Sequence, residues 1–195
     1  MAHGSYLWPH SGAILCGGRS TRMGEPKHDL KLPDGRTMIE VVRASLGDIC
    51  QSLVVVGPKE ILPELPHVND LRENQGPLAG LEALLASGLD ERYLVVPCDV
   101  PRVNASLLRM LVDAPPASIA TFQVAGSDRR ETMPLRISAT CLKEVVMLLD
   151  QGRRAVHQLF DHVECVSVTI TKKQAACLLN VNTPEDFNSI ERPES

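Results

Sequence analysis

The stretch LCGGRSTRMGEPK, residues 15–27, follows a short apolar run that is typical of a buried strand. It contains three glycines and three cationic side chains, which are Gly17, Gly18, Gly24, Arg19, Arg22 and Lys27. Glycines let backbone N–H groups turn toward a bound anion without a Cβ in the way. Arginine and lysine supply the charge that phosphate oxygens attract. The stretch therefore predicts a loop that binds a polyphosphate, and the alternative is a glycine-rich surface turn with solvated cations.

The overall composition is that of an ordinary globular chain without a broad basic face. The 195 residues are enough for one domain with a core, and the net charge of −4 with only 3% aromatic residues argues against nucleic acid as a partner. No apolar run approaches the length of about 20 residues that spans a bilayer. Residues 12–190 are expected to form the domain, and residues 1–11 and 191–195 its flexible ends. No signal-peptide pattern is present and the six cysteines form no CxxC pair, so we predict a cytoplasmic protein with reduced thiols.

Strand-like and helix-like segments alternate along the chain. Apolar runs predict strands at residues 12–16, 52–56, 93–97, 118–124, 135–137 and 163–170. Helical spacing and capping residues predict helices at residues 37–46, 77–85, 104–112, 139–150 and 154–160, and a last helix that begins at Thr183. This alternation predicts a single-domain α/β fold with a mostly parallel, doubly wound sheet and helices on both faces.

Two candidate functional segments directly follow predicted strands. In such sheets ligands bind at the carboxyl ends of the strands, so the loop after residue 16 and Asp99, which follows the strand at 93–97, should share one cleft. A carboxylate there can hold Mg²⁺, which takes oxygen ligands and keeps substrate phosphates and waters. The alternative for Asp99 is an acidic residue in a surface turn before Pro101.

The glycine-rich loop is neither of the two common phosphate-binding motifs, because the chain contains no Gly-Lys-Ser/Thr and no GxGxxG. It resembles the loop of nucleotidyltransferases that make nucleotide-linked cofactors and sugars. Within that group, Gly17-Gly18 and Arg22-Met23-Gly24 are most similar to the molybdenum cofactor guanylyltransferases, which have the Rossmann-like nucleotide-diphospho-sugar transferase fold. Cytidylyltransferases of this fold more often carry Ala-Gly at the first pair.

Three further motifs support the resemblance. Residues 98–101 are similar to the family's Cys-Asp-x-Pro metal motif, residues 76–80 to its Gly-Pro-Leu-Ala-Gly, and residues 180–184 to its Asn-x-Asn-Thr-Pro. Local structure explains part of each motif, since proline suits the first turn of a helix and Thr183 can cap one. It does not explain Gly80, which weakens a helix interior by about 1 kcal/mol. The four matches have the order and spacing of the family.

The resemblance implies a Mg²⁺-dependent enzyme that transfers GMP from GTP to the terminal phosphate of molybdopterin and releases pyrophosphate. Arg22 and Lys27 would steady the phosphates, and Asp99 would bind the metal ion. The residues that would bind the nucleotide or the metal are Leu15, Cys16, Gly17, Gly18, Lys27, Asp70, Gly76, Pro77, Leu78, Gly80, Asp99 and Asn182. Residues 133–135 and 152–154 match weaker family positions in the region that meets the pterin. Contact with proteins that make or deliver the cofactor is also implied.

The chain differs from the family at a position that contacts the base of the nucleotide. The guanylyltransferases usually present an asparagine after the second strand, and this chain has Gly57-Pro58-Lys59 instead. The aspartate expected before residues 76–80 corresponds to Asp70 with altered spacing. CTP as the donor and a sugar phosphate as the acceptor therefore stay open as alternatives. A catalytically silent nucleotide-binding module is a further alternative, against which the retention of Arg22, Lys27 and Asp99 argues.

Overall fold

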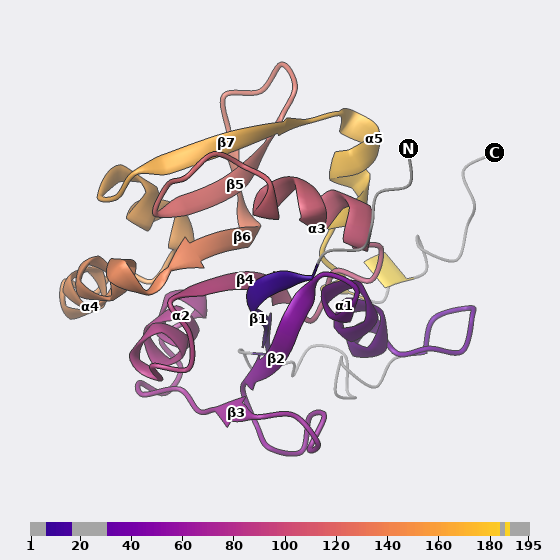
Figure 1. The fold of residues 1–195 in the computed structure, drawn as a ribbon, viewed down its shortest axis with the longest axis horizontal. Helices are drawn as coiled ribbons and strands as arrows, with labels where there is room; N and C mark the ends of the chain where they lie inside the picture. Colours follow the sequence, from indigo (N-terminus) through magenta and orange to yellow (C-terminus); the bar gives the residue numbers. More distant parts are fainter. Residues whose placement is uncertain (1–6, 17–30, 184–185, 188–195) are drawn as a thin grey trace.

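The computed structural model describes residues 7–16, 31–183 and 186–187. Over these residues the chain forms one seven-stranded sheet with helices on both faces (Figure 1). The strands are β1 (Trp8–Leu15), β2 (Cys50–Val56), β3 (His67–Val68), β4 (Arg92–Pro97), β5 (Ile119–Val124), β6 (Arg130–Ser138) and β7 (Cys165–Ile170). The α-helices are α1 (Met38–Gly47), α2 (Pro77–Ala86), α3 (Ala105–Val112), α4 (Leu142–Asp150) and α5 (Lys172–Ala175). Short 3₁₀ helices are η2 (Ala139–Cys141), η3 (Val156–Asp161) and η4 (Ala176–Leu178).

The predicted mostly parallel α/β fold is confirmed. The strand order is β3-β2-β1-β4-β6-β5-β7, and β1 pairs in parallel with both β2 and β4. This register sets Leu15 opposite Val56 on one side and Pro97 on the other, so three strands end at the same level. Strand β6 is antiparallel to β4 and β5. It begins at Arg130, five residues before the strand predicted from residue 135.

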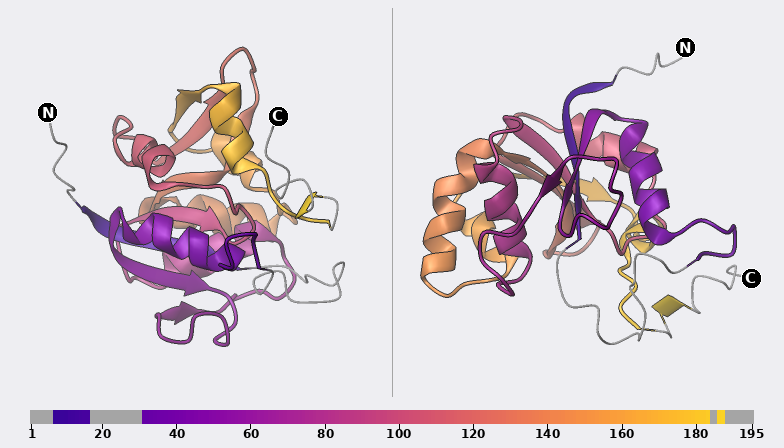
Figure 2. Two further views of the ribbon diagram at one scale, coloured as in Figure 1. Left: turned by 90° about the vertical axis from the view of Figure 1, so that its right-hand side faces the viewer. Right: turned by 90° about the horizontal axis from the view of Figure 1, so that it is seen from below.

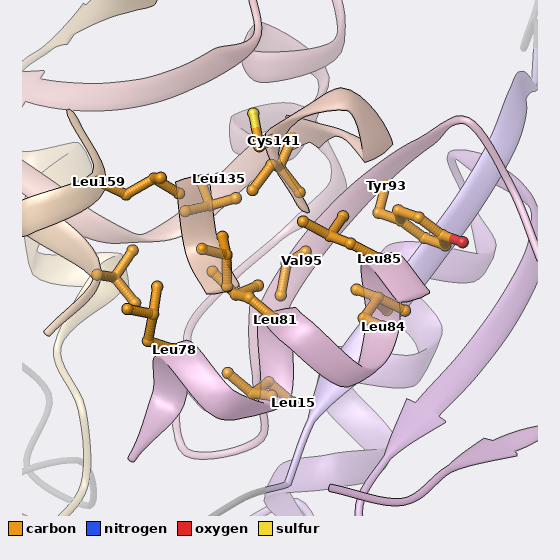
Figure 3. Packing of buried hydrophobic residues seen from close by; sticks show 14 of the residues in the cluster. Leu15, Leu78, Leu81, Leu84, Leu85, Tyr93, Val95, Leu135, Cys141 and Leu159 are labelled. Carbon is orange, nitrogen blue, oxygen red and sulfur yellow. The ribbon is translucent and has the colours of Figure 1, made fainter. Parts of the chain in front are cut away.

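Two layers of helices cover the two faces of the sheet. Helices α2 and α4 lie against one face, and α1 and α3 against the other (Figure 2). On the first face, leucines of α2 point toward Leu15, Val95 and Leu135 of the sheet (Figure 3). Each fully buried leucine contributes roughly 1.5–3 kcal/mol through loss of apolar contact with water. Helix α2 is therefore held rigidly beside the ends of β1 and β4.

The helix caps predicted from the sequence are confirmed. Thr37 Oγ1 accepts a hydrogen bond from Glu40 N at 3.3 Å, and Thr37 N donates to Glu40 Oε2 at 2.7 Å, which is the predicted capping box of α1. Asn104 Oδ1 likewise accepts from Leu107 N at 3.0 Å and caps α3. Gly152 has a φ of +78° just after α4, in the left-handed region that ends helices.

Strand β1 begins at Trp8, so residues 8–11 belong to the sheet and not to a flexible lead. Ser11 donates from both its backbone N and its Oγ to Asp90 Oδ2, at 2.8 and 2.9 Å, and His10 Nδ1 lies 2.7 Å from Asp90 Oδ1. Burial alone would raise the pKa of Asp90, but these hydrogen bonds outweigh burial and lower it below its usual value. The carboxylate of Asp90 thus ties the first strand to the loop before β4.

Two further expectations bear on the class of the protein. All six cysteines are free thiols, as predicted. Among the helices within the described ranges, none combines the length and the apolar character needed to cross a bilayer.

Substitution of Gly80 tests the close packing of α2 on β1. A Cβ at Gly80 would lie 2.5 Å from Leu15 Cδ1 and 3.5 Å from Val56 Cγ1. We expect Gly80→Ala to lower the free energy of unfolding by about 1–3 kcal/mol, because the buried leucine must shift. Gly47→Ala is the matched control, since nothing lies within 4 Å of its Cβ, and it should be neutral or stabilising by up to about 1 kcal/mol. Urea unfolding measures both, and equal stability of Gly80→Ala and wild type would contradict the packing.

Candidate active site

The carboxyl ends of the central strands are joined by backbone hydrogen bonds that continue beyond the strands themselves. Cys16 N donates to Val56 O at 2.8 Å, and Cys98 N donates to Leu15 O at 3.1 Å. Gly57 N donates to Val68 O at 3.0 Å, which extends the row to β3. Cys16, from which the glycine-rich loop starts, and Asp99 consequently lie at the same edge of the sheet. For these two residues the predicted shared edge is confirmed.

Part of the predicted site lies outside the described residues. Gly17, Gly18, Arg22 and Lys27 belong to the stretch 17–30, and their roles stay predictions.

A pocket of about 600 Å³ opens at this edge, beside the ends of β1 and β2. Six residues that the sequence predicted as binding residues line it, namely Leu15, Cys16, Asp70, Gly76, Pro77 and Gly80. Its opposite wall is the connection between β3 and α2, which contributes Asn69, Glu73, Asn74 and Gln75. These four were missed, because a polar loop has no periodicity that indicates which of its side chains face a ligand. The structure thus joins the predicted residues with a polar wall.

The chemistry of this pocket combines hydrogen-bonding groups with the start of a helix. Desolvation raises the pKa of the Asp70 carboxyl, whose two oxygens can accept N–H donors. Gly76 is the residue before α2, with a φ of +75°, and it lines the pocket together with Pro77, so α2 begins at the pocket. Helix N-termini carry a partial positive charge that attracts anions. The pocket can therefore accept a ligand with both N–H donors and negative charge.

Two residues of the Gly-Pro-Leu-Ala-Gly motif have packing roles that the sequence did not predict. The side chain of Leu78 is 0% exposed and lies in the core beneath α2, so it cannot reach a ligand in the pocket. Gly80 was expected to let a ligand approach the backbone at the start of the helix. It lines the first pocket, and it is also buried in α2, where its missing Cβ makes room for Leu15. Leu78 and Gly80 thus both serve the contact between helix and sheet.

A second pocket of about 570 Å³ lies next to the first and shares Leu15 and Pro77 with it. Asp99 lines this second pocket, together with Met133 of β6 and His157 of η3. Met133 belongs to the segment predicted to meet the acceptor. Arg154, also in a predicted acceptor segment, donates through its guanidinium to Leu149 O at 2.8 Å and so binds the end of α4. Two adjacent pockets thus meet at the end of β1 and the start of α2.

The C-terminal motif reaches the same edge through the backbone. Val181 N donates to Asp99 O at 2.9 Å, which brings the neighbouring Asn182 to the end of β4. Thr183 Oγ1 accepts from Asp186 N at 3.1 Å, and Thr183 N donates to Asp186 Oδ2 at 2.9 Å, so the predicted cap is confirmed. The two motifs are far apart in sequence and contact each other in the fold.

The thiol of Cys16 is unsuited to nucleophilic catalysis. The hydrogen bond with Cys98, burial and the charge of Asp99 raise the pKa of Cys16 far above its ordinary value. Cys16 therefore stays protonated at neutral pH, whereas the thiolate is the reactive form of cysteine. Within residues 7–16, 31–183 and 186–187, no three or more His, Cys, Asp or Glu side chains form a group that could hold a metal ion. A metal ion at Asp99 would take most of its ligands from substrate and water, as Mg²⁺ commonly does.

Comparison with known proteins identifies relatives across most of the chain. The family described as "MobA-like NTP transferase domain" matches residues 12–166. A protein of Xanthomonas euvesicatoria named molybdenum cofactor guanylyltransferase is 34% identical over 187 residues, which cover 93% of this chain and 94% of the relative. The structure is similar to that of molybdopterin-guanine dinucleotide biosynthesis protein A from Archaeoglobus fulgidus, with a TM-score of 0.76, 22% identity, and coverage of 93% and 97% of the two chains.

A 4-diphosphocytidyl-2C-methyl-D-erythritol synthase from Anaerococcus prevotii has a TM-score of 0.71 and 13% identity, with coverage of 93% of each chain. At these identities, the likeness to both solved structures shows the fold alone.

Proposed function

Because the chain belongs to the family of MobA-like NTP transferases and is a nucleotidyltransferase, we propose that it transfers GMP from GTP to the terminal phosphate of molybdopterin. The structural observation that carries the proposal is the pair of adjacent pockets, which share Leu15 and Pro77 and of which the second is lined by Asp99. A group-transfer enzyme must hold its donor and its acceptor in contact, with the reacting atoms at the boundary. The name of the relative with 34% identity supports guanylyl transfer to the molybdenum cofactor as the reaction.

The proposed reaction is an in-line displacement at the α-phosphorus of GTP. An oxygen of the terminal phosphate of molybdopterin attacks this phosphorus, the bond to the bridging oxygen of the β-phosphate breaks, and pyrophosphate leaves with the electron pair. GTP would lie in the pocket beside β1, β2 and α2, and the pterin in the pocket lined by Met133 and His157. The protein contributes alignment and charge neutralisation rather than a covalent intermediate. The protonated state of Cys16 agrees with such a mechanism.

The phosphates would be bound by the loop that follows β1 and by the start of α2. Arg22 and Lys27 would neutralise the charge on the transferred and leaving phosphates, and the amides of Gly17 and Gly18 would hold phosphate oxygens. The start of α2, after Gly76, would add the positive end of the helix dipole. Together these groups would favour the developing negative charge on pyrophosphate.

Asp99 is the group that we assign to a magnesium ion. Its carboxylate is a hard oxygen donor at the end of β4, and the Val181–Asp99 backbone bond brings the amide of Asn182 to the same edge, so the donor set fits Mg²⁺. When bound, the ion supplies Lewis-acid stabilisation of the phosphate oxygens. Asp99 would orient the phosphates by this means and fix them between the two pockets. We also propose a cytoplasmic location and contact with proteins that make or receive the cofactor.

A second candidate is cytidylyl transfer within the same family. It is favoured by one observation, the glycine at position 57 where guanylyltransferases usually carry a base-contacting asparagine. The reaction chemistry would be the same and only the base would differ.

A nucleotide panel distinguishes the two candidates. Pyrophosphate release should be measured with GTP, CTP, ATP and UTP in the presence of molybdopterin and Mg²⁺. We expect kcat/KM for GTP to exceed that for the other nucleotides by at least about tenfold, which corresponds to about 1.4 kcal/mol of discrimination. Omission of molybdopterin is the control for nucleotide hydrolysis. Preference for CTP would overturn guanylyl transfer, and no release with any nucleotide would overturn the activity itself.

Replacement of Asp99 tests its assignment to the metal ion. We expect Asp99→Asn to lower kcat by at least about 100-fold, equivalent to roughly 2.7 kcal/mol, because the amide is neutral and binds Mg²⁺ poorly. Asp113→Asn, at an exposed carboxylate after α3, is the matched control and should be fully active. Both variants should keep their unfolding midpoints within about 2 °C of wild type. A near-normal rate for Asp99→Asn would show that the assignment is wrong.

A further inference from the structure

The first pocket, in which the base of the nucleotide would lie, has no side chain at position 57, where the family usually provides an asparagine. Gly57 has a φ of +147°, and a Cβ there would lie 2.9 Å from Cys16 O and 3.0 Å from Cys16 Cβ. Cys16, directly after β1, therefore leaves no room for an asparagine at position 57. Hydrogen-bonding side chains that can read a base come instead from the facing wall, the connection of residues 69–75, which we call the base loop.

The base loop turns into α2 through two residues in the left-handed backbone region. Asn74 has a φ of +57° and the adjoining Gly76 a φ of +75°, both in the left-handed region. Glycine adopts this region freely, and asparagine is among the residues with a Cβ that adopt it most readily. Since Asp70 and Gln75 line the pocket, whatever fixes the loop also fixes the groups offered to a ligand.

Arg72 ties the base loop to two helices. Its Nε donates to both carboxylate oxygens of Glu82 at 3.0 Å each, and its second terminal nitrogen lies 2.9 Å from Glu82 Oε1. Its first terminal nitrogen donates to Asp150 Oδ1 at 2.7 Å. Glu82 belongs to α2 and Asp150 to the end of α4. Arg72 is not among the residues that line the pocket, so it can affect a ligand only through its neighbours.

The two carboxylates differ in environment, which predicts unequal importance. Glu82 is only 4% exposed, whereas the side chain of Asp150 is 61% exposed. The Arg72 side chain is 32% exposed, so its pair with Glu82 is partly buried. A forked, charge-assisted contact fixes orientation strongly, and a partly buried pair is screened less by salt and water than an exposed one. Loss of Arg72 would also leave the Glu82 carboxylate buried without its cation. The Glu82 contact should therefore hold the base loop, and the Asp150 contact should add little.

We propose that Arg72 is the positioning residue for base discrimination. Its bonds to Glu82 hold the base loop so that the Asp70 carboxylate and the side-chain amides of the loop face a guanine. This inference rests on the proposed function. Guanine presents two adjacent N–H donors, at N1 and the 2-amino group, which one carboxylate can accept together. Cytosine offers acceptors at N3 and O2 where these donors would be, so a fixed carboxylate opposes it. If the loop moved freely, the carboxylate would no longer favour guanine over cytosine.

Direct nucleotide binding tests the inference without turnover. The Kd values of GTP and CTP are measured by calorimetry with Mg²⁺ on the full chain. For Arg72→Ala we expect Kd for GTP to rise about tenfold and Kd for CTP to change less than twofold. Asp150→Asn should change both by less than twofold. Arg43→Gln breaks a partly exposed ion pair with Glu64 and is the matched control, with values equal to wild type.

A double variant separates positioning from general stability. Arg72→Ala combined with Glu82→Gln removes the buried unpaired charge, so it should regain most of the unfolding midpoint lost by Arg72→Ala. It should keep the reduced GTP/CTP ratio, because the loop is still not held. Arg72→Lys, which keeps the charge without the fork, should recover part of the ratio. With molybdopterin, the loss should appear in KM for GTP and leave kcat within about threefold.

Two results would overturn the role of Arg72. One is a folded Arg72→Ala protein with the wild-type GTP/CTP ratio, and the other is a ratio that returns with stability in the double variant. Failure of the proposed function has a different result, a wild-type protein that prefers CTP or binds neither nucleotide. If wild type prefers CTP, the guanine assignment is wrong, and the role of Arg72 holds only if Arg72→Ala erodes that preference. Absence of binding to either nucleotide overturns both.

Discussion

The candidate site depends on the parallel pairing of β1 with β2 and β4. Two backbone hydrogen bonds complete this pairing, from Cys16 N to Val56 O and from Cys98 N to Leu15 O. Because of these two bonds, the segments that follow the three strands start side by side. A shift of register by one residue in β4 would turn Asp99 to the opposite face of the sheet. The buried apolar side chains on both faces prevent such a shift, so the core that stabilises the fold also aligns the chemistry.

Helix α2 connects the sheet to the walls of the first pocket. Its inner face is buried against the sheet, its first turn begins at Gly76 beside the pocket, and its Glu82 receives Arg72 from the base loop. The C-terminal segment adds a second connection, because Val181 bonds to Asp99 O and its side chain is buried beside Met38 of α1. Irregular segments with functional side chains are thus fixed to rigid elements, which is the arrangement that precise alignment of two substrates requires.

Sequence reasoning succeeded where the signal is local and failed where the contact is distant in the chain. The capping box at Thr37 and the carboxylate after a buried strand at Asp99 are readable because neighbouring residues carry the information. The packing role of Gly80 depends on Leu15, which is 65 positions earlier. The contact of Arg72 with Asp150 joins residues that are 78 positions apart. No periodicity or motif predicts such contacts, because the topology of the sheet decides which segments meet.

The most direct test of the account is a crystal structure of the protein with Mg²⁺ and a GTP analogue that resists cleavage between the α- and β-phosphates. The account predicts one triphosphate bound at the ends of β1 and β4, with Lys27 Nζ on its phosphate oxygens and the Asp99 carboxylate on the ion that contacts the same phosphates. Lys27 and Asp99 on separate sides of the molecule, without a common ligand, would contradict it.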